Sequence, residues 1–297
     1  EIAKVLSQKN LQVSKYNCIF AAQLHFIRKD PDMEKAKRIP YGVSNFIDIV
    51  QRNQYYVDKT MYIPKLEDEA DALFFIRPRR FGKSLFISMM RAYYDIDKKD
   101  RFQELFGNLW IGTHPTENQG KYQVLYLDFS KIGGKIEQLE ENFNAYCNEC
   151  LDSFIETYQE YYPARVVENV YKAATAARKL NVIGIAAEKA SLPLYLIVDE
   201  YDNFTNVVLN EQGEEVYTAL THASGFYREI FKVFKGMFAK IFMTGVSPVT
   251  LDDLTSGFNI GWHISTKPVF NQMLGFSTED VRELFTYYKE MGEIRSD

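Results

Sequence analysis

The chain runs Ile76-Arg77-Pro78-Arg79-Arg80-Phe81-Gly82-Lys83-Ser84-Leu85 at the point that decides its fold. An apolar segment, residues 72–76, leads into this stretch, and a helical pattern over residues 85–94 follows it. A strand, a short loop ending in Gly-Lys-Ser and a helix are the context of a P-loop, or Walker A motif. In such a loop, backbone N–H groups and the helix N-terminus converge on an anion, the lysine reaches the terminal phosphates, and the hydroxyl ligates magnesium. The sequence therefore predicts a phosphate-binding site here.

One position departs from the usual pattern G-x-x-x-x-G-K-[ST], whose first glycine falls on Arg77. That glycine permits a tight turn out of the strand, whereas an arginine leaves the strand at an ordinary negative φ. We therefore expect the loop to be more open at its start. A Gly-Lys-Ser tripeptide alone is a weak signal, and the alternative interpretation is a basic turn before a surface helix. The flanking strand and helix favour the P-loop.

The residues that we expect to contact the nucleotide are consecutive in the loop and the first helical turn: Arg79, Arg80, Phe81, Gly82, Lys83, Ser84 and Leu85. Of the two arginines, we expect one to pair with a phosphate or a nearby carboxylate, since a planar guanidinium suits both partners. The other is then a surface charge.

Composition narrows the functional classes. The 297 residues suggest one large or two modest domains, and a hydrophobic content of 46% is ample for a buried core. The formal net charge of −5 gives no overall attraction to nucleic acid or to an anionic membrane, although this total does not exclude local basic patches. The sequence has no apolar run of about 18 residues, so we predict no transmembrane segment and no membrane partner.

The cysteines also bear on location and metal binding. There are three, Cys18, Cys147 and Cys150, too few for a disulfide scaffold and suited to a reducing compartment, so we expect a cytoplasmic protein. The spacing of Cys147 and Cys150 matches a lone CxxC motif. Because zinc would need two further ligands, buried thiols on a helix face are the favoured interpretation.

Alternating strand and helix patterns indicate the fold class. Apolar segments predict three further strands, at residues 122–129, 194–198 and 239–244. Helical patterns lie between them, over residues 135–190, interpreted as two helices with a bend near Pro163, and over residues 216–235. This alternation predicts an α/β fold of the P-loop NTPase type, a doubly wound parallel sheet flanked by helices.

An acidic pair follows the apolar strand Leu196-Ile197-Val198, namely Asp199 and Glu200. We expect Asp199 to hold magnesium beside the hydroxyl of Ser84, and Glu200 to polarise the attacking water. The alternative is a strand that ends in two solvated carboxylates. Asp202 is a further nearby carboxylate, for which a simple turn after the strand is at least as good an interpretation.

The fourth predicted strand ends in polar residues. Thr244 and Ser247 are both candidates to contact the γ-phosphate or position water, and the alternative is an ordinary turn. Together with Lys83 and Glu200, Thr244 completes the predicted catalytic set. Arg228 is a candidate arginine finger acting in trans, although a solvated helix charge is the favoured interpretation.

These motifs resemble those of the bacterial AAA-ATPase-like family. The resemblance covers about residues 39–288 and rests on five ordered motifs: residues 77–84, 56–60, 198–202, 226–228 and 242–248. It implies a P-loop ATPase core akin to archaeal-type and STAND ATPases, often followed by a C-terminal nuclease-like domain of the PD-(D/E)XK class. We find no matching nuclease motif here, because residues 34–37 match only superficially, so any nuclease activity would lie outside this sequence.

Three segments are expected. Residues 1–38 form an N-terminal extension with a charged linker, residues 39–270 form the P-loop ATPase-like domain, and residues 271–297 begin a helical lid that is truncated. Ser277 or Thr278 is expected to cap the first helix of this lid, because acidic residues occupy its first turn.

The functional expectation is Mg²⁺-dependent ATP binding with slow ATP hydrolysis, which requires ATP and Mg²⁺ as cofactors. The main alternative is a nucleotide-gated switch or scaffold that regulates a nucleic-acid-acting nuclease domain absent from this chain. A homo-oligomer is compatible with either function. A small-molecule kinase is less favoured, because nothing in the sequence marks an acceptor pocket.

Overall fold

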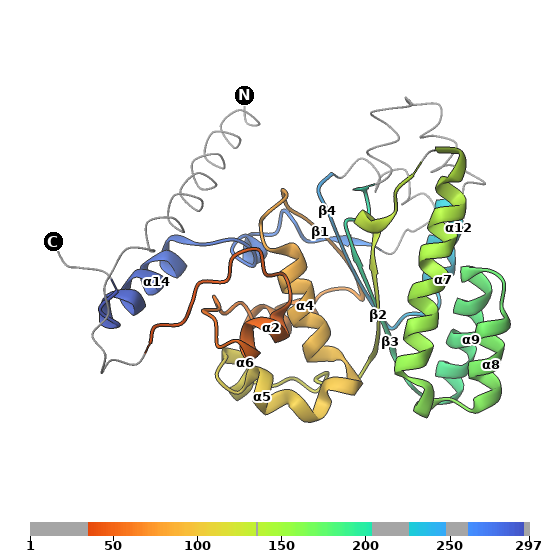
Figure 1. The fold of residues 1–297 in the computed structure, drawn as a ribbon, viewed down its shortest axis with the longest axis horizontal. Helices are drawn as coiled ribbons and strands as arrows, with labels where there is room; N and C mark the ends of the chain where they lie inside the picture. The colour runs from red at the N-terminus through yellow and green to blue at the C-terminus, as the bar shows by residue number, and fades with distance from the viewer. Residues whose placement is uncertain (1–34, 135, 204–225, 248–260, 294–297) are drawn as a thin grey trace. The chain divides into compact units, whose positions relative to one another are not determined.

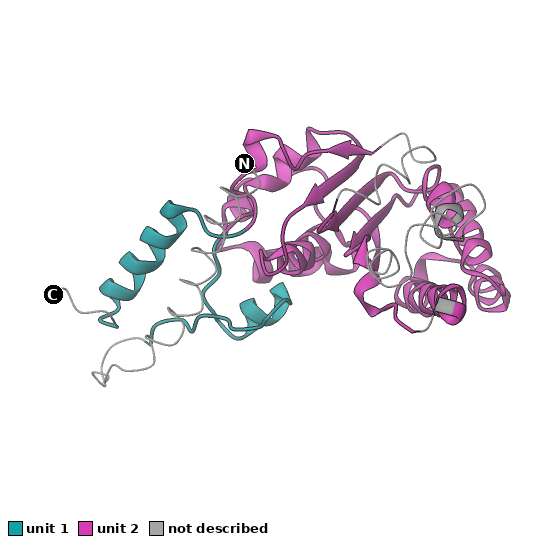
Figure 2. Cartoon of the chain, turned by 90° about the horizontal axis from the view of Figure 1, so that it is seen from above, with its two compact units in different colours: residues 1–57, 275–297 teal, residues 58–274 magenta. Residues whose placement is uncertain are grey.

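The computed structural model describes residues 35–134, 136–203, 226–247 and 261–293 (Figure 1). The chain divides into two compact units, Asp58–Leu274 and a smaller unit of Glu1–Val57 with Gly275–Asp297 (Figure 2). Within the described ranges, no helix is both long and apolar enough to cross a membrane.

The larger unit contains a five-stranded sheet in the order β2-β3-β4-β1-β5, and all four neighbouring pairs are parallel. Its strands are β1 (Ala72–Ile76), β2 (Gln123–Asp128), β3 (Leu194–Asp199), β4 (Lys240–Gly245) and β5 (Trp262–His263). The four predicted strands are confirmed. The fifth strand was not predicted, because two residues are too short to show any periodicity.

Helices cover both faces of this sheet (Figure 1). Helix α4 lies on one face, and α7, α9 and α12 lie on the other. The helices of the larger unit are α3 (Tyr62–Glu67), α4 (Lys83–Tyr94), α5 (Phe102–Phe106), α6 (Trp110–Thr113), α7 (Leu139–Thr157), α8 (Ala164–Lys172), α9 (Ala176–Lys189) and α12 (Phe226–Phe234). Short 3₁₀ turns join several of them: Ile96–Arg101, Phe129–Lys131, Ile136–Gln138, Gln159–Tyr161 and Pro268–Phe270. The predicted α/β doubly wound fold is therefore confirmed.

The position of each strand explains its sequence. All six residues of β3 are buried, because this strand lies inside the sheet and is covered on both faces. Burial alternates along β2, an edge strand, with Leu125 and Leu127 buried. These leucines pack in a core with Phe143 and Leu151 of α7. Burying one such side chain contributes about 1.5–3 kcal/mol, so this layer holds α7 on the sheet.

The prediction of two helices over residues 135–190 is wrong, because the chain breaks twice in this range. Helix α7 ends at Thr157, and Pro163 stands at the N-cap of α8, where its missing N–H costs nothing. A second break follows, because Thr175 caps α9 by accepting a hydrogen bond from the Arg178 N–H at 3.3 Å. The region therefore forms three helices. Of the helix predicted over residues 216–235, Phe226–Phe234 is helical and residues 216–225 lie outside the described residues.

The smaller unit contains α2 (Phe46–Gln51) and α14 (Thr278–Glu290). Ser277 and Asp280 form a reciprocal capping box at the start of α14, so the predicted helix start is confirmed with Ser277 as its cap. Aromatic rings join the two parts of this unit: the Tyr55 ring centroid lies 5.1 Å from that of Tyr287 and 5.9 Å from that of Tyr288. The role of residues 271–297 as a lid, and the predicted segment boundaries, stay predictions.

Candidate nucleotide-binding site

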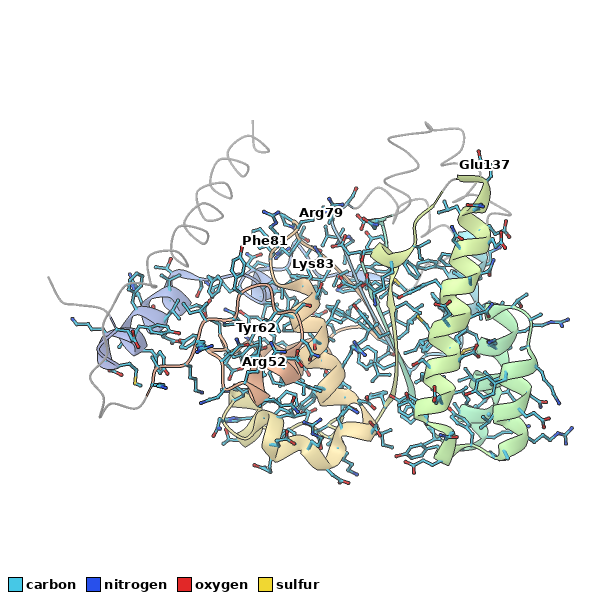
Figure 3. The ribbon with its side chains drawn as sticks, in the orientation of Figure 1. Arg52, Tyr62, Arg79, Phe81, Lys83 and Glu137 are labelled. Atoms are coloured by element: carbon cyan, nitrogen blue, oxygen red, sulfur yellow. The ribbon has the colours of Figure 1, made fainter. Side chains whose placement is uncertain are left out.

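The predicted strand, loop and helix form the centre of the site. Strand β1 ends at Ile76, and the 12-residue helix α4 begins at Lys83. Gly82 is the N-cap of α4 at φ 86°, a left-handed conformation that glycine adopts without steric cost. The N–H groups of the first helical turn are oriented toward the loop, as an anion site requires. Figure 3 places Arg79 and Phe81 at the tip of the loop and Lys83 below them.

The side chain of Lys83 lies beneath the loop, with 5% of the residue exposed. Its ammonium donates hydrogen bonds to the carbonyl oxygens of Arg77 at 3.1 Å and Pro78 at 3.3 Å. The same nitrogen lies 3.5 Å from Oε1 of Glu200. A buried ammonium needs such partners, because an unpaired charge in this position would be strongly destabilising. The structure thus brings together the predicted lysine and the predicted acid.

Asp199 is the centre of a second network. Its Oδ2 accepts a hydrogen bond from the Ser84 hydroxyl at 2.6 Å, and its Oδ1 accepts one from the Thr244 hydroxyl at 2.6 Å. Asp199 and Thr244 are each 1% exposed. The three residues come from the start of α4 and the ends of β3 and β4. They meet because the carboxyl ends of neighbouring parallel strands lie at one edge of the sheet, where the helix after β1 also begins.

Glu200 has an unusual backbone conformation. Its φ of 54° places it in the left-handed region, which costs a non-glycine residue about 1–2 kcal/mol. The residues that follow hold it there: the Tyr201 N–H donates to the Thr244 carbonyl at 3.0 Å, and the Asn203 N–H donates to the Glu200 carbonyl at 2.9 Å. The strained residue is the one predicted to act on water, and its side chain is 18% exposed.

Asp202 has a role that the sequence interpretation missed. It is fully buried, and its carboxylate accepts hydrogen bonds from the N–H groups of Val246, at 3.1 and 3.0 Å, and Ser247, at 2.5 Å. The Tyr201 hydroxyl donates to the Ser247 carbonyl at 2.7 Å. Tyr201 and Asp202 therefore fasten the chain after β3 to the chain after β4. The only sequence signal was an acid placed soon after a strand that already ends in two acids.

The remaining predicted residues lie around the loop. Arg79 and Arg80 are exposed, and the Arg79 guanidinium is 3.4 Å from Oδ1 of Asn203, a long contact. Phe81 and Leu85 are partly buried. Ser247, the other candidate after β4, is partly buried. The side chain of Arg228, on α12, lies outside the described residues.

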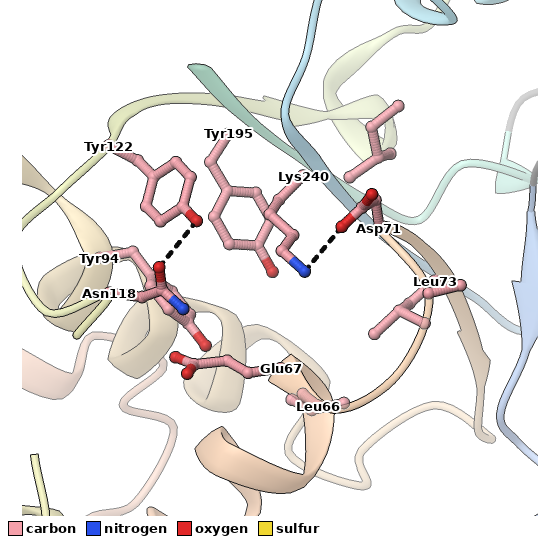
Figure 4. A pocket seen from close by; sticks show the side chains of 11 residues that line it. Leu66, Glu67, Asp71, Leu73, Tyr94, Asn118, Tyr122, Tyr195 and Lys240 are labelled. Atoms are coloured by element: carbon pink, nitrogen blue, oxygen red, sulfur yellow. Dashed lines mark hydrogen bonds and ion pairs between the residues drawn. The ribbon is translucent and has the colours of Figure 1, made fainter. Parts of the chain in front are cut away.

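A small cavity lies at the opposite edge of the sheet (Figure 4). Its volume is about 10 Å³, the space of about one water molecule. Glu67, Tyr94, Tyr122 and Tyr195 line it, and burial raises the pKa of Tyr195. Because Tyr122 and Tyr195 lie at the amino ends of β2 and β3, the cavity is separate from the P-loop edge.

Comparison with known proteins gives a family match and a similar protein. A family model described as "Predicted AAA-ATPase" matches residues 40–255, a range that contains the loop, Asp199 and Thr244. The chain is also similar to an "Uncharacterized protein in vnfD 5'region" of Azotobacter chroococcum mcd 1, with 26% identity over 264 residues. That alignment covers 84% of this chain and 45% of the relative, so the chain spans less than half of the relative's length.

Proposed function

The chain belongs to the Predicted AAA-ATPase family, as its five motifs indicated, and on that premise we propose that it binds ATP with Mg²⁺ and hydrolyses it slowly. The observation that carries this proposal is the double hydrogen bond to Asp199, from Ser84 on the P-loop helix and from Thr244 on a neighbouring strand. An aspartate at a strand end beside the P-loop hydroxyl is the arrangement by which P-loop NTPases hold magnesium, and the bond from Thr244 fixes that carboxylate.

Phosphate binding is assigned to the loop. The N–H groups at the start of α4 and the Gly82 turn provide backbone donors, and the helix dipole favours an anion there. Lys83 supplies the positive charge. The ammonium has three N–H donors, so it can turn the one that contacts the Pro78 carbonyl to a phosphate oxygen while it keeps the bond to the Arg77 carbonyl. Arg79 and Arg80 add positive charge at the exposed tip.

Magnesium fits the chemistry of the Asp199 network. The Ser84 hydroxyl and the Asp199 carboxylate are hard oxygen donors, which Mg²⁺ prefers, and their oxygens lie 2.6 Å apart. Ser84 would bind the ion directly, and Asp199 would hold it directly or through water. When bound, the ion neutralises charge on the β- and γ-phosphates.

Hydrolysis is assigned to Glu200 and Thr244. Glu200 directly follows the metal-site acid, and its carboxylate would accept a hydrogen bond from the attacking water and orient it. Its 3.5 Å contact with Lys83 keeps the side chain directed toward the phosphate end of the loop. The Thr244 hydroxyl donates its single hydrogen to Asp199, so in this arrangement it would accept a hydrogen bond from the water. To donate to the γ-phosphate instead, it would have to release Asp199. Stabilisation of the transferring phosphoryl group would be mainly electrostatic.

A second candidate is a nucleotide-gated switch whose turnover is incidental. The observation in its favour is the length of the relative, more than half of which lies outside the match to this chain. In this function the nucleotide would order a surface that regulates a further domain, and a nuclease-like domain is the one that the family resemblance suggests.

The test combines ATP binding, measured by calorimetry with Mg²⁺ and with EDTA, and phosphate release. We expect Lys83→Ala to weaken ATP binding by about tenfold or more. We expect Glu200→Gln to keep binding within about threefold and to lose turnover by about a hundredfold. Lys172→Ala, which removes an exposed charge on α8, is the matched control and should change neither.

The outcomes separate the candidates. Magnesium-dependent ATP binding without measurable turnover in the parent protein would favour the switch. Failure of the folded parent protein to bind ATP, with or without Mg²⁺, would refute both.

A further inference from the structure

Arg77 occupies the place of the first P-loop glycine, and its side chain makes a specific set of contacts. One terminal nitrogen donates to the carbonyl of Ile76 at 3.0 Å and to the carbonyl of Ser265 at 2.9 Å. The other approaches the carbonyl of Phe270 at 3.4 Å. The guanidinium carbon lies 4.4 Å from the centroid of the Phe75 ring. These contacts direct the charge toward the segment after β5, residues 264–270.

The backbone around Arg77 is held at the same place. The Ile76 N–H donates to the Ser265 hydroxyl at 2.8 Å, and the Arg77 N–H donates to the Gly245 carbonyl at 3.2 Å. The carbonyl of Arg77 in turn accepts a hydrogen bond from the Lys83 ammonium. One residue therefore joins the end of β4, the segment after β5 and the lysine of the loop.

The chemistry of this site requires an arginine. Burial lowers the pKa of Arg77, which shows that its surroundings disfavour the charge, and the carbonyl dipoles and the aromatic face compensate for it. A guanidinium reaches two carbonyls 188 and 193 residues away in the sequence because its donors form a planar fork. A lysine carries a single point charge and cannot make the same set of contacts.

We propose that Arg77 is a positioning residue of the nucleotide site. It fixes the start of the phosphate loop by a tertiary anchor on residues 264–270, in place of the local turn that the usual glycine provides. The anchored Arg77 carbonyl then holds Lys83 beneath the loop. Residues 264–270 are thereby part of the nucleotide-binding apparatus, and their conformation is coupled to loop occupancy. The coupling rests on the ATP binding proposed above, whereas the anchor does not.

The test uses two variants of the full chain. Arg77→Gly restores the usual motif, and Arg77→Lys keeps the charge without the fork. Arg178→Lys, at an exposed position on α9, is the matched control. The anchor is tested by amide hydrogen exchange without nucleotide. The exchange rate is measured at the amides of Ile264, Lys267 and Phe270, each of which is hydrogen-bonded in the structure. We expect exchange there to be about tenfold faster in both variants, while peptides from α7 keep the parent rates.

The affinity for ATP measures whether Arg77 positions the phosphate loop for the nucleotide. We expect both variants to bind ATP about tenfold more weakly, and we expect ATP to slow exchange over residues 264–270 in the parent protein only. Unchanged exchange together with equal or tighter ATP binding by Arg77→Gly would overturn the proposal, because the arginine would then be a tolerated replacement. If the parent protein does not bind ATP, the proposed function fails, and the exchange comparison alone decides the anchor. If Arg77→Gly does not fold, Arg77→Lys provides the same comparison.

Discussion

Asp199 and Thr244, at the ends of neighbouring strands, are joined by a 2.6 Å hydrogen bond between two almost fully buried side chains. The second carboxylate oxygen of Asp199 is occupied by the Ser84 hydroxyl. The strand pair and the P-loop helix thus share one carboxylate, and a change at any of the three residues should affect both stability and the nucleotide site.

Thr244→Val removes one of these donors with little change in shape. We expect the free energy of unfolding to fall by about 1–3 kcal/mol, because one oxygen of a buried carboxylate loses its partner. Urea denaturation measures the change, and Thr244→Ser, which keeps the hydroxyl, should lose less. A Thr244→Val protein as stable as the parent would show that the bond contributes nothing.

Asp202→Asn tests the connection between the chain after β3 and the chain after β4. The substitution removes the charge and leaves one acceptor oxygen for the N–H groups of Val246 and Ser247. We expect a loss of about 1–3 kcal/mol in the free energy of unfolding. Because the same segment holds Glu200 in its left-handed conformation, turnover should fall more than ATP affinity. Equal losses of kcat and affinity would argue against a positioning role.

Gly245→Ala should destabilise the end of β4. A Cβ at this position would lie 2.5 Å from Cε1 of Tyr201 and 2.6 Å from Oδ1 of Asp202, closer than real contacts allow. Both neighbours are buried, so we expect a loss of about 1–3 kcal/mol in thermal or urea unfolding. Gly236→Ala is the control, because a Cβ there would meet no atom within 4 Å. Equal stability of the two variants would show that a Cβ at position 245 does not clash with Tyr201 and Asp202.

The thiols of α7 should react slowly in the native protein. Burial raises the pKa of both Cys147 and Cys150, so the reactive thiolate is scarce near neutral pH. We expect alkylation by iodoacetamide at pH 8 to be at least about tenfold slower than in urea, with each site measured by peptide mass spectrometry. Rapid native alkylation of Cys147, which is 1% exposed, would contradict this.

The same shifts give the sign of a pH effect on stability. A raised pKa in the folded state means that folding favours the neutral thiol. The contribution is therefore complete below the unfolded pKa of about 8.5 and is lost as pH rises through the folded pKa. Buried tyrosines such as Tyr146 and Tyr158 also have raised pKa values, so the cysteine effect is measured between about pH 8.5 and pH 10, below the range in which unfolded tyrosines titrate. Replacing both cysteines by alanine should reduce the fall in stability over that range, and an unchanged fall would contradict this interpretation.

Much of the fold could be predicted from local sequence. The strands β1, β2, β3 and β4 are apolar runs with polar residues at their ends, so their positions and the sheet edge that they share followed from periodicity. The predicted helix number failed between Pro163 and Thr175, because the cap formed by Thr175 resembles any threonine within a helical run. The two-residue strand β5 forms by pairing with β1 and leaves no pattern of its own.

Of the candidate site, the contiguous part was predictable: Gly82, Lys83 and Ser84 follow β1, and Asp199 and Glu200 end β3. The roles of Arg77 and Asp202 could not be predicted, because their partners are largely backbone groups far along the chain. Every residue carries a carbonyl and nearly every residue carries an N–H, so the sequence does not mark which of these groups is the partner. The sequence by itself determined which side chains end each strand and open the helix, since neighbours along the chain set local structure. Tertiary structure alone decided which backbone groups those side chains contact, since only the order β2-β3-β4-β1-β5 brings residues 77, 202, 246 and 265 to one edge of the sheet.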